Sequence, residues 1–414
     1  MRHAIRRFWV AFLCIASSTP VWAESAAVSE PALEEVLIIG SKTAAKNVSG
    51  SANFISEQDL ERFDQIDLRK VLNQVAGVYI REEDGFGLRP NIGIRGAAAE
   101  RSQKVTIMRD GVLITPAPYS APAAYYIPNV SRIASVEVLK GPAATAYGPH
   151  TVGGAINLAS PSIPAGDSKG FVDLSVGSDG YYKGQASYGA TKGNFGYVVD
   201  LLSYGADGFK RVDRSNQDTG FERNDIGIKV AYALPQSRFE HRATFLLEVG
   251  DEEADETYLG LTDDDFRATP NRRYAASQLA KFTSEHYNAL LNYSARLTPK
   301  NTTNIKLYWN KFDRSWNKLD RFWRGPSLQR ILSAPDQYEL YYSILTGERD
   351  SSGSPDQTLD VTNNFRKYLS SGFQWTLSDA REFGGISIDT LVGLRFHTDQ
   401  VERDHQPRTY LMSN

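Results

Sequence analysis

Apolar side chains recur at every second position from Gly170 almost to the end of the chain, and this alternation restricts the fold more than any other feature of the sequence. In residues 226–234, Ile, Val, Tyr and Leu alternate with Gly, Lys and Ala. Residues 243–249 and 287–297 repeat the pattern, with aromatic residues near the segment ends. Because side chains of a strand point alternately to its two faces, the pattern predicts β-strands with one apolar face and one mostly polar or small face.

The connections between these strands distinguish a membrane barrel from a soluble sandwich. The second, fourth, sixth and eighth connections are tight, whereas the others are long, apart from a short first one at residues 178–180. Short turns that alternate with long loops are typical of outer-membrane barrels, and a sandwich has no reason to keep that order. We therefore predict part of an antiparallel transmembrane β-barrel in residues 167–414, with about nine strands at residues 170–177, 181–190, 194–204, 222–234, 239–250, 283–297, 302–315, 359–377 and 385–402.

The odd number of strands suggests that the barrel is incomplete. Closed single-chain barrels of bacteria have an even number of strands, and an open sheet edge in lipid would leave backbone groups without hydrogen-bond partners. We therefore expect further strands beyond Asn414, so that this chain holds only the N-terminal part of the barrel.

The first 23 residues have the pattern of a secretory signal peptide. Three arginines within the first seven residues precede an apolar segment at residues 8–16, and Ala23 ends the expected cleavage site. Cleavage would also remove Cys14, the single cysteine, so the mature protein would have no thiol or disulfide chemistry. No apolar run reaches the roughly 20 residues that a membrane-spanning helix needs, so a membrane would be crossed by strands.

Residues 24–51 form a polar arm that contains one strand-prone segment, EEVLIIG at residues 34–40. Such a segment, with no core of its own, is suited to adding to the sheet edge of another protein through main-chain hydrogen bonds. The alternative is that it forms an edge strand of the domain that follows.

Residues 52–166 read as a small α+β domain. Ser56 with Asp59 and then Asp67 predict the starts of two short helices, and Asp110-Gly111 predicts a hairpin. The stretch EVLKGPAATAYGPHTVGGAINL, residues 137–158, predicts a strand, a short helix that begins at Pro142, and a second strand. An ordinary small α/β domain would also account for Gly-rich turns between short strands.

Three motifs of this domain carry a family resemblance: NIGIRG at residues 91–96, VTIMRDGV at 105–112 and the stretch at 137–158. In this order and spacing they resemble the plug domain of the TonB-dependent outer-membrane receptors of Gram-negative bacteria. The resemblance implies an α+β plug domain inside an antiparallel transmembrane β-barrel. It also implies an outer-membrane location among lipid and lipopolysaccharide, and a periplasmic TonB box that binds the TonB energy-coupling protein, formed by Glu35, Val36, Leu37, Ile38 and Ile39.

The sequence gives little support for catalysis or for a metal centre. The histidines after residue 23 are scattered without metal-ligand spacing, and no nucleophile motif or phosphate loop occurs. We interpret the acidic stretches at 251–256 and 263–265, and that between His397 and His405, as solvated loops rather than metal sites. We therefore expect no catalytic residues and no cofactor, with iron carried as chelated substrate. The mildly acidic balance, a formal charge of −3, gives no indication of nucleic-acid binding.

The expected substrate is an anionic ferric chelate. The segments APYSAP, ETYLGLTDDDF and RRYAASQ resemble the receptors that take up ferric citrate and related ferric siderophores, whereas receptors for cobalamin, haem or saccharides share the plug motifs. Arginine forks bind carboxylates in bidentate fashion, and aromatic rings cover apolar edges of a chelate. A passive porin or adhesin barrel is the alternative from another class. The candidate substrate-binding residues are Arg89, Arg101, Tyr119, Tyr125, Arg273, Trp316, Arg321, Trp323 and Arg324.

Overall fold

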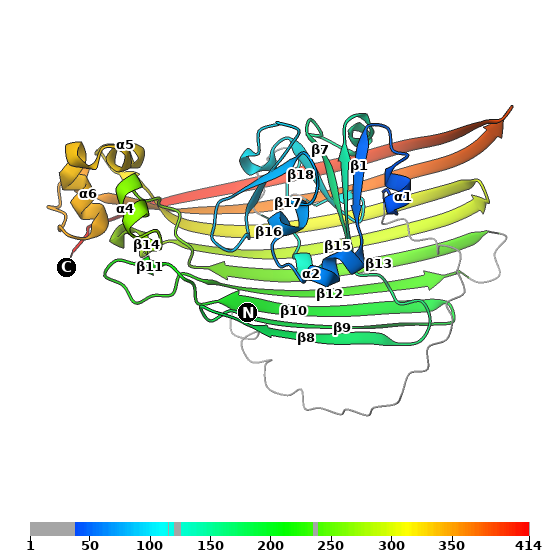
Figure 1. The fold of residues 1–414 in the computed structure, drawn as a ribbon, viewed down its shortest axis with the longest axis horizontal. Helices are drawn as coiled ribbons and strands as arrows, with labels where there is room; N and C mark the ends of the chain where they lie inside the picture. The colour runs from blue at the N-terminus through cyan, green and yellow to red at the C-terminus, as the bar shows by residue number, and fades with distance from the viewer. Residues whose placement is uncertain (1–37, 115, 120–125, 235–238, 414) are drawn as a thin grey trace, which may run out of the picture. The chain divides into compact units, whose positions relative to one another are not determined.

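The computed structural model describes residues 38–114, 116–119, 126–234 and 239–413. The predicted signal peptide, residues 1–23, lies outside the described residues, as do Tyr125 and the first three TonB-box residues, Glu35, Val36 and Leu37. Two sheets dominate the fold, a mixed one in the N-terminal part and a long antiparallel one in the C-terminal part (Figure 1). None of the helices in the described ranges is long and apolar enough to cross a membrane.

The N-terminal sheet contains the predicted strand, helix, strand unit. Its strands lie in the order β1 (Ser51–Ile55), β6 (Ser135–Lys140), β7 (Gly154–Ala159), β4 (Val105–Arg109) and β5 (Val112–Leu113). β4 and β7 are parallel, whereas the other pairs are antiparallel. β4, β6 and β7 are buried along their whole length, so their polar residues, among them Glu137 and Asn157, are buried with the apolar ones.

Local signals explain the turns and helices around this sheet. Ser56 and Asp59 form a reciprocal capping box at the start of α2 (Glu57–Phe63), and Asp67 caps α3 (Leu68–Leu72). Hydrogen bonds from Lys42 and Ser56 lower the pKa of Asp59 to about 2. The remaining elements are α1 (Lys42–Ala45), the pair β2 (Val78–Glu82) and β3 (Pro90–Ile94), and the 3₁₀ helices η2 (Glu100–Ser102), η3 (Val130–Arg132) and η4 (Pro142–Tyr147).

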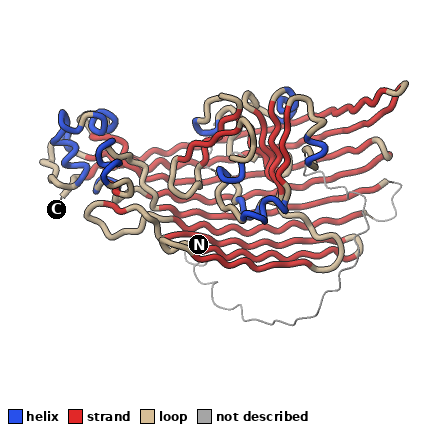
Figure 2. The backbone as a smooth tube through the Cα atoms, in the orientation of Figure 1, coloured by secondary structure: helices blue, strands red, loops and turns tan. Residues whose placement is uncertain are grey.

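The C-terminal sheet confirms the predicted nine strands and their antiparallel pairing (Figure 2). Neighbouring strands follow the chain without a crossover, apart from the short β11 and β14, which pair with each other in the loops. The strands are β8 (Lys169–Val176), β9 (Tyr182–Lys192), β10 (Phe195–Ala206), β12 (Phe221–Ala233), β13 (Glu240–Ala254), β15 (Lys281–Thr298), β16 (Asn301–Phe322), β17 (Leu359–Phe383) and β18 (Ile386–Tyr410).

Several predicted strand ends were too early: β17 continues to Phe383 instead of residue 377, and β18 to Tyr410 instead of residue 402. β16 continues to Phe322 instead of ending at residue 315, so Trp316 and Arg321 lie on the strand and not in the loop that follows it. The pairing of β16 with β17 shifts by a bulge between Leu319 and Arg321. The outward positions after Trp309 carry the polar Lys311, Asp313 and Ser315, so the apolar alternation that marks a strand ends before the strand does.

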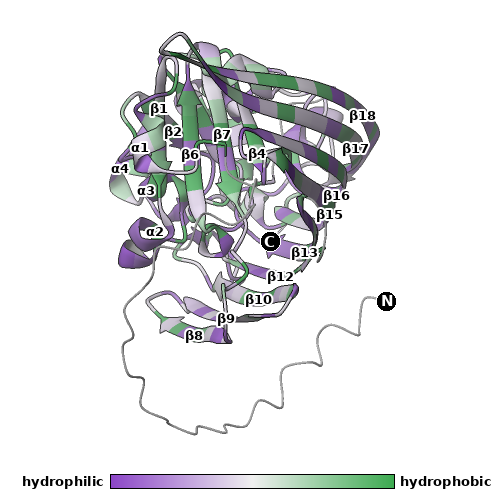
Figure 3. Cartoon of the chain, turned by 90° about the vertical axis from the view of Figure 1, so that its right-hand side faces the viewer, coloured by the Kyte–Doolittle hydropathy of each residue, from purple (hydrophilic) through white to green (hydrophobic). Residues whose placement is uncertain are grey.

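Burial in this sheet is the reverse of that in a soluble protein. The apolar Ile226, Ile228 and Leu247 are exposed, while their polar neighbours Asp225 and Glu248 are buried. The alternation of polar and apolar residues is visible along β16, β17 and β18 in Figure 3. A wall that is apolar outside and polar inside is what a lipid-facing β-barrel requires, because lipid cannot solvate polar groups.

The long connections carry their own secondary structure at one end of the sheet, here called the loop end; the tight turns form the opposite turn end. The loop elements are β11 (Arg211–Val212), α4 (Asp263–Ala268), β14 (Arg272–Arg273), η5 (Ala275–Ser277), α5 (Leu328–Ser333), η6 (Pro335–Tyr338), α6 (Glu339–Thr346) and η7 (Pro355–Gln357). Figure 1 shows α4, α5 and α6 together at this end. The acidic run at 263–265 forms the first turn of α4, capped by Thr262, where negative charge complements the helix dipole.

Candidate functional site

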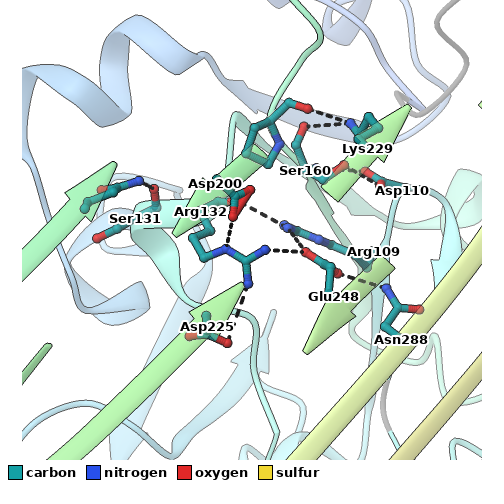
Figure 4. A network of polar contacts seen from close by, with 12 residues as sticks. Arg109, Asp110, Ser131, Arg132, Ser160, Asp200, Asp225, Lys229, Glu248 and Asn288 are labelled. Atoms are coloured by element: carbon teal, nitrogen blue, oxygen red, sulfur yellow. Dashed lines mark hydrogen bonds and ion pairs between the residues drawn. The ribbon is translucent and has the colours of Figure 1, made fainter. Parts of the chain in front are cut away.

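A buried charge network joins the N-terminal domain to the inner face of the sheet (Figure 4). Nη2 of Arg109, at the end of β4, lies 2.6 Å from Oε1 of Glu248 on β13. Nη2 of Arg132, in η3, lies 3.3 Å from the same oxygen. No more than 5% of any of these three side chains is exposed.

Arg132 has further acidic partners on two other strands. Its Nε contacts Oδ2 of Asp200 on β10 at 2.5 Å, and its Nη1 lies 3.6 Å from Oδ1 of Asp225 on β12. Burial by itself disfavours the charge of Arg132, but the three carboxylates outweigh it and raise its pKa. Asn288 on β15 donates to Oε2 of Glu248 at 2.9 Å. Three strands of the wall, β10, β12 and β13, therefore contact the domain through buried charges, and β15 supports Glu248 from within the wall.

Arg89, a predicted substrate residue, forms a second buried ion pair between the domain and the wall. Its Nη2 lies 2.5 Å from Oε1 of Glu252 on β13, and its Nη1 lies 3.8 Å from Oδ2 of Asp84. Its Cζ also lies 4.0 Å from the centroid of the Phe282 ring. The side chain is only 5% exposed. The structure therefore places Arg89 inside the contact between domain and wall.

The wall also holds the domain through main-chain atoms. Nζ of Lys306 on β16 donates to the carbonyl of Asp110 at 2.8 Å, and Nζ of Lys229 on β12 donates to the carbonyl of Pro161 at 2.6 Å. Nη2 of Arg223 donates to the carbonyl of Ile127 at 2.8 Å. The acceptors of these three bonds are main-chain carbonyl groups of the domain, so the bonds do not depend on the side chains at Asp110, Ile127 and Pro161. They hold the domain in addition to the charge network.

The other predicted substrate residues lie at different heights of the sheet: Tyr119 is at mid-height, where Asp399 pairs with Ser370 and Ser370 with Asn310, and the rest are toward the loop end. Tyr119 is 51% exposed, and its N–H donates to Oδ2 of Asp399 on β18 at 2.8 Å. Arg101 is exposed and has a left-handed backbone, with φ 52°, that is held by a bond from its N–H to Oδ1 of Asn91. Trp323, at 53% exposed, and Arg324 follow β16, and Arg273 is half-buried in β14.

Trp316 brings cations and aromatic rings together on the inner face of β16. Nζ of Lys318 lies 5.2 Å from the ring centroid of Trp316 and 4.3 Å from that of Tyr258, while Cζ of Arg314 lies 6.0 Å from Trp316. We call these residues, with Arg101, the loop-end cluster. Arg321 is separate from it: its Nε pairs with Oδ2 of Asp360 at 3.0 Å.

The position of Lys318 favours contact with an anion. It lies nine residues beyond Trp309, or about 30 Å along a strand, so it is well past the exposed apolar band. The guanidinium groups of Arg101 and Arg314 repel the ammonium group of Lys318, whereas the carboxylates of Asp320 and Glu83 attract it. Arg101 therefore lies near enough to Lys318 for their charges to interact. An anionic ligand placed among them would relieve this repulsion.

A cavity of about 760 Å³ opens beside Lys318, within the usual range for a small-molecule site. Tyr258 and Lys318 line one part of it, and Leu328, Leu332 and Arg267 line another. It therefore lies between the connection that follows β13 and the one that follows β16.

A single carboxylate ties three of the long connections together. Asp265 accepts a hydrogen bond from the hydroxyl of Tyr274 at 2.6 Å and another from the hydroxyl of Tyr342 in α6. It also lies 3.0 Å from Nη1 of Arg272, whose Nε reaches Asp213 at 2.9 Å. Burial raises the pKa of Asp265, but the hydrogen bonds from both tyrosines outweigh it and lower the pKa overall. Asp265 therefore links the connection after β13 to that after β16, while Arg272–Asp213 and the pairing of β11 with β14 link it to the connection after β10.

The described end of the predicted arm does not form an edge strand. The N–H groups of Ile38, Ile39 and Gly40 all donate to the carboxylate of Glu137 on β6, at 2.7 to 2.8 Å. Ile39 is also buried in a cluster with Met108 and Leu139.

Sequence reasoning missed the partners that matter most in this arrangement, namely Glu137, Arg109, Arg132, Glu248 and Lys318. Glu248 could have been found from the sequence, because it lies on the polar face of a predicted barrel strand. Burying a charge inside a barrel costs free energy unless an opposite charge pairs with it. Across the described ranges, no group of three or more His, Cys, Asp or Glu side chains is placed to hold a metal ion.

Comparison with known proteins agrees with the geometry. Residues 44–155 match the family described as TonB-dependent Receptor Plug Domain. A vitamin B12 transporter, BtuB, of Photobacterium profundum is 28% identical over 185 residues, which cover 44% of this chain and 29% of that protein. Its counterpart in Vibrio vulnificus is 30% identical over 173 residues, which cover 42% of this chain and 27% of that protein. The chain thus spans less than a third of these curated relatives.

Solved structures share the fold. The unliganded ferric citrate transporter FecA has a TM-score of 0.72 at 20% identity, covering 93% of this chain and 53% of that one. The siderophore receptor PiuA of Acinetobacter baumannii has a TM-score of 0.61 at 15% identity, and the match covers 89% of this chain and 49% of that one. The chain therefore spans about half of each. The chain therefore contains a TonB-dependent receptor plug domain at residues 44–155, and over both sheets its fold is similar to that of these solved outer-membrane proteins.

Proposed function

We propose that this protein takes part in the energy-coupled uptake of an anionic ferric chelate, such as ferric citrate or a carboxylate siderophore, across the outer membrane. The observation that carries the proposal is the loop-end cluster, where Lys318, Arg314 and Arg101 converge beside Trp316 and Tyr258. Cations beside aromatic rings suit a ligand with carboxylate oxygens and apolar edges.

Other predicted residues extend this proposed ligand face. Trp323 and Arg324 keep much of their side-chain surface exposed, Arg273 is half-buried, and the exposed Tyr119 lies at mid-height of the wall, against Asp399 of β18. Arg89 is occupied by Glu252, so we propose for it a role in holding the plug rather than in contacting the chelate. Removing one charged contact to a ligand typically costs about 2–5 kcal/mol, which is at least tenfold in affinity.

Energy coupling is proposed to act through the arm, with TonB as the partner. An extended segment that offers main-chain groups can be added to a partner's sheet, and the family match supports such a partner for this chain. No resident cofactor is part of the proposal, because iron would arrive and leave as the chelate.

Cobalamin uptake is the second candidate, because the two curated relatives are vitamin B12 transporters. The two candidates differ in the role of charge at the cluster. A ferric carboxylate chelate needs the cations, whereas cobalamin would depend mainly on the aromatic surfaces.

Equilibrium binding to the complete receptor separates these candidates. The ligands are ferric citrate, other ferric carboxylate chelates, cobalamin and haem, and the variants are Arg101→Ala, Lys318→Met and Arg324→Ala. Arg381→Ala is the matched control, because Arg381 is exposed at the turn end. We expect a ferric chelate to bind tightest and to lose affinity about tenfold in Lys318→Met but not in the control. Tightest binding of cobalamin, or ferric binding insensitive to all three variants, would contradict the proposal. Uptake that persists without a proton-motive force would instead indicate a passive barrel.

A further inference from the structure

The cavity beside Lys318 is polar in one part and apolar in another. In the polar part, Nζ of Lys318 lies 4.3 Å from the ring centroid of Tyr258, and both residues line the cavity. In the apolar part, Leu328 and Leu332 line it from α5. These leucines are four positions apart, so they lie on the same face of the helix, and both are only half-buried. The cavity therefore offers a cation beside an aromatic ring in one place and a leucine surface in another.

The leucine surface is supported by a core of the loop end itself. Leu328 and Leu332 pack against a buried cluster that includes Ile331, Ile344 and Leu345, each 0% exposed. A surface held in this way is formed before a ligand arrives, so little ordering entropy would oppose binding there.

The two sides of the cavity are joined by a hydrogen bond. α4 contributes Asp264 and Arg267 to one side, and α5 contributes its leucines to the other. The hydroxyl of Tyr342, in α6, donates to Asp265 of α4. Because α6 packs on the same core as α5, this bond holds α4 beside α5 and keeps the cavity between them.

The charges along the cavity favour an uncharged group between α4 and α5. Asp263 and Asp264, in the first turn of α4, line the cavity, and Nη1 of Arg267 already lies 2.9 Å from Oδ1 of Asp264. Lys318 is compensated less closely, with its Nζ 3.9 Å from Oδ1 of Asp320. A carboxylate of a ligand would therefore be attracted to Lys318 and repelled from the space next to α4.

The leucine surface is the part of the site that an anionic head group does not use. A chelate that contacts Lys318 with carboxylates alone would leave Leu328 and Leu332 in water. An apolar chain on that surface removes apolar area of both partners from water, and each methylene buried in this way raises the affinity roughly fourfold. The cavity volume of about 760 Å³ leaves room for such a chain.

We propose that the substrate is an amphiphilic ferric chelate, with its iron-bearing carboxylate head at the loop-end cluster and an acyl chain in the cavity between α4 and α5. This inference rests on the proposed uptake of an anionic ferric chelate and narrows its substrate class. Lys318 belongs to both parts of the site, because it lines the cavity and lies beside Trp316 of the cluster. Leu328 and Leu332 are then the residues that distinguish an acylated siderophore from ferric citrate.

Equilibrium binding of a matched pair of ligands tests the acyl-chain site. The probes are the ferric complexes of a citrate-derived chelator and of the same chelator with a linear acyl chain of about eight carbons, long enough to cover the leucines. Binding is measured on the complete receptor, with parent and variants in the same detergent, so that partition of the chain into micelles is common to all samples. We expect the parent to bind the acylated chelate at least about tenfold tighter than the unacylated one.

A polar substitution on the leucine surface should abolish this preference. Leu332→Gln is expected to reduce it to less than about threefold, with the affinity for the unacylated chelate unchanged, because the amide must lose water when the chain binds. Leu340→Gln is the matched control, because Leu340 of α6 packs on the same core but lies outside the cavity lining among the described residues. The control should keep the parental preference.

A second variant leaves both leucines in place, in case Leu332→Gln disturbs the fold of the loops. Gly260 lines the cavity, and a Cβ added there meets no described atom within 4 Å. Gly260→Phe therefore has room for its ring in the space that the chain would occupy. The same loss of preference is expected.

The outcomes separate this inference from the proposed function. Equal affinity of the parent for the two chelates, with both bound tightly, would overturn the acyl-chain site and leave the proposed function standing. A preference that persists in both Leu332→Gln and Gly260→Phe would put the chain elsewhere and overturn the site as well. Displacement of the acylated chelate by a fatty acid of the same chain length, at equal concentration, would show a lipid site that does not need the iron-bearing head, which also contradicts the inference. Failure of both chelates to bind would refute the proposed function and, with it, this inference.

Discussion

Arg109 and Glu248 are 139 positions apart in the chain, and their side chains meet at 2.6 Å in the buried contact between plug and wall. Glu248 serves Arg132 as well, so one carboxylate neutralises parts of two guanidinium groups. Removing one partner from such a group leaves uncompensated charge, which is far more costly than removing an exposed ion pair.

We expect Glu248→Gln to loosen the plug. The substitution keeps the size of the side chain and its bond to Asn288 but deprives both arginines of their shared anion, which should lower the free energy of unfolding by roughly 3–5 kcal/mol. Urea unfolding in detergent micelles measures this. Glu253→Gln is the control, because Glu253 is 50% exposed and pairs with Lys281 at the surface; it should cost less than about 1 kcal/mol. Equal effects of the two substitutions would show that the network does not hold the plug.

We expect Ile38→Pro to separate binding from uptake. Proline removes an N–H and restricts the backbone, so the arm could not pair fully with a strand of TonB. Binding of ferric chelate at the surface should be normal while accumulation in cells is lost. Ile38→Val, which keeps the N–H and the strand propensity, is the control. Transport at the parental rate by the proline variant would show that this segment is not the coupling element.

We expect Leu247→Arg to oppose insertion of the sheet into lipid. Leu247 is 38% exposed on the outer apolar face of β13. A charged residue on the lipid side of a barrel costs about 2–4 kcal/mol near the bilayer midplane. Folding titrations into phospholipid vesicles would report the loss, and Leu247→Phe, which stays apolar, should fold like the parent. If arginine and phenylalanine behave alike, the exposed apolar face does not meet lipid.

The tie at Asp265 should be stable to acid. Because the pKa of Asp265 is lowered in the folded protein, its contribution to stability is complete above the ordinary carboxyl value of 3.8 and disappears only as the pH falls through the folded pKa. Proteolysis within residues 255–280 should therefore be equally slow at pH 7 and pH 5.

Asp265→Asn should weaken the same tie at every pH. The amide keeps one acceptor oxygen but loses the charge that attracts Arg272, so cleavage within residues 255–280 should be faster at both pH 7 and pH 5. Asp264→Asn, at a side chain that is 95% exposed, is the control. Cleavage as slow in Asp265→Asn as in the parent would argue against the tie.

Features set by neighbouring residues could be predicted from the sequence. The nine strands follow from strict alternation, and the capping box of α2 depends only on Ser56 and Asp59. The end of β16 was missed because its outward positions after Trp309 are polar, so the apolar alternation ends before the strand does.

The site could be predicted only in part, because it depends on pairing between distant residues. Arginine at position 89 reads as a ligand for an anion until Glu252, 163 positions later, is seen beside it. No motif in the sequence marks Lys318 as a candidate site residue. Its contact with the rings of Tyr258 and Trp316 is visible only in the folded structure. The same holds for Glu137, whose alternating strand context hides its role as an acceptor for the arm.

The acidic lining of the wall limits how a passage can open. Asp200, Asp225, Glu248 and Glu252 are neutralised in large part by Arg132, Arg109 and Arg89 of the plug. If the plug left as a whole, these carboxylates would face an open lumen, and their potential would repel an anionic cargo. A rearrangement confined to part of the plug, with the three arginines still in place, would leave the lumen without this barrier. For cargo of the proposed class, partial opening is therefore electrostatically easier than ejection of the plug.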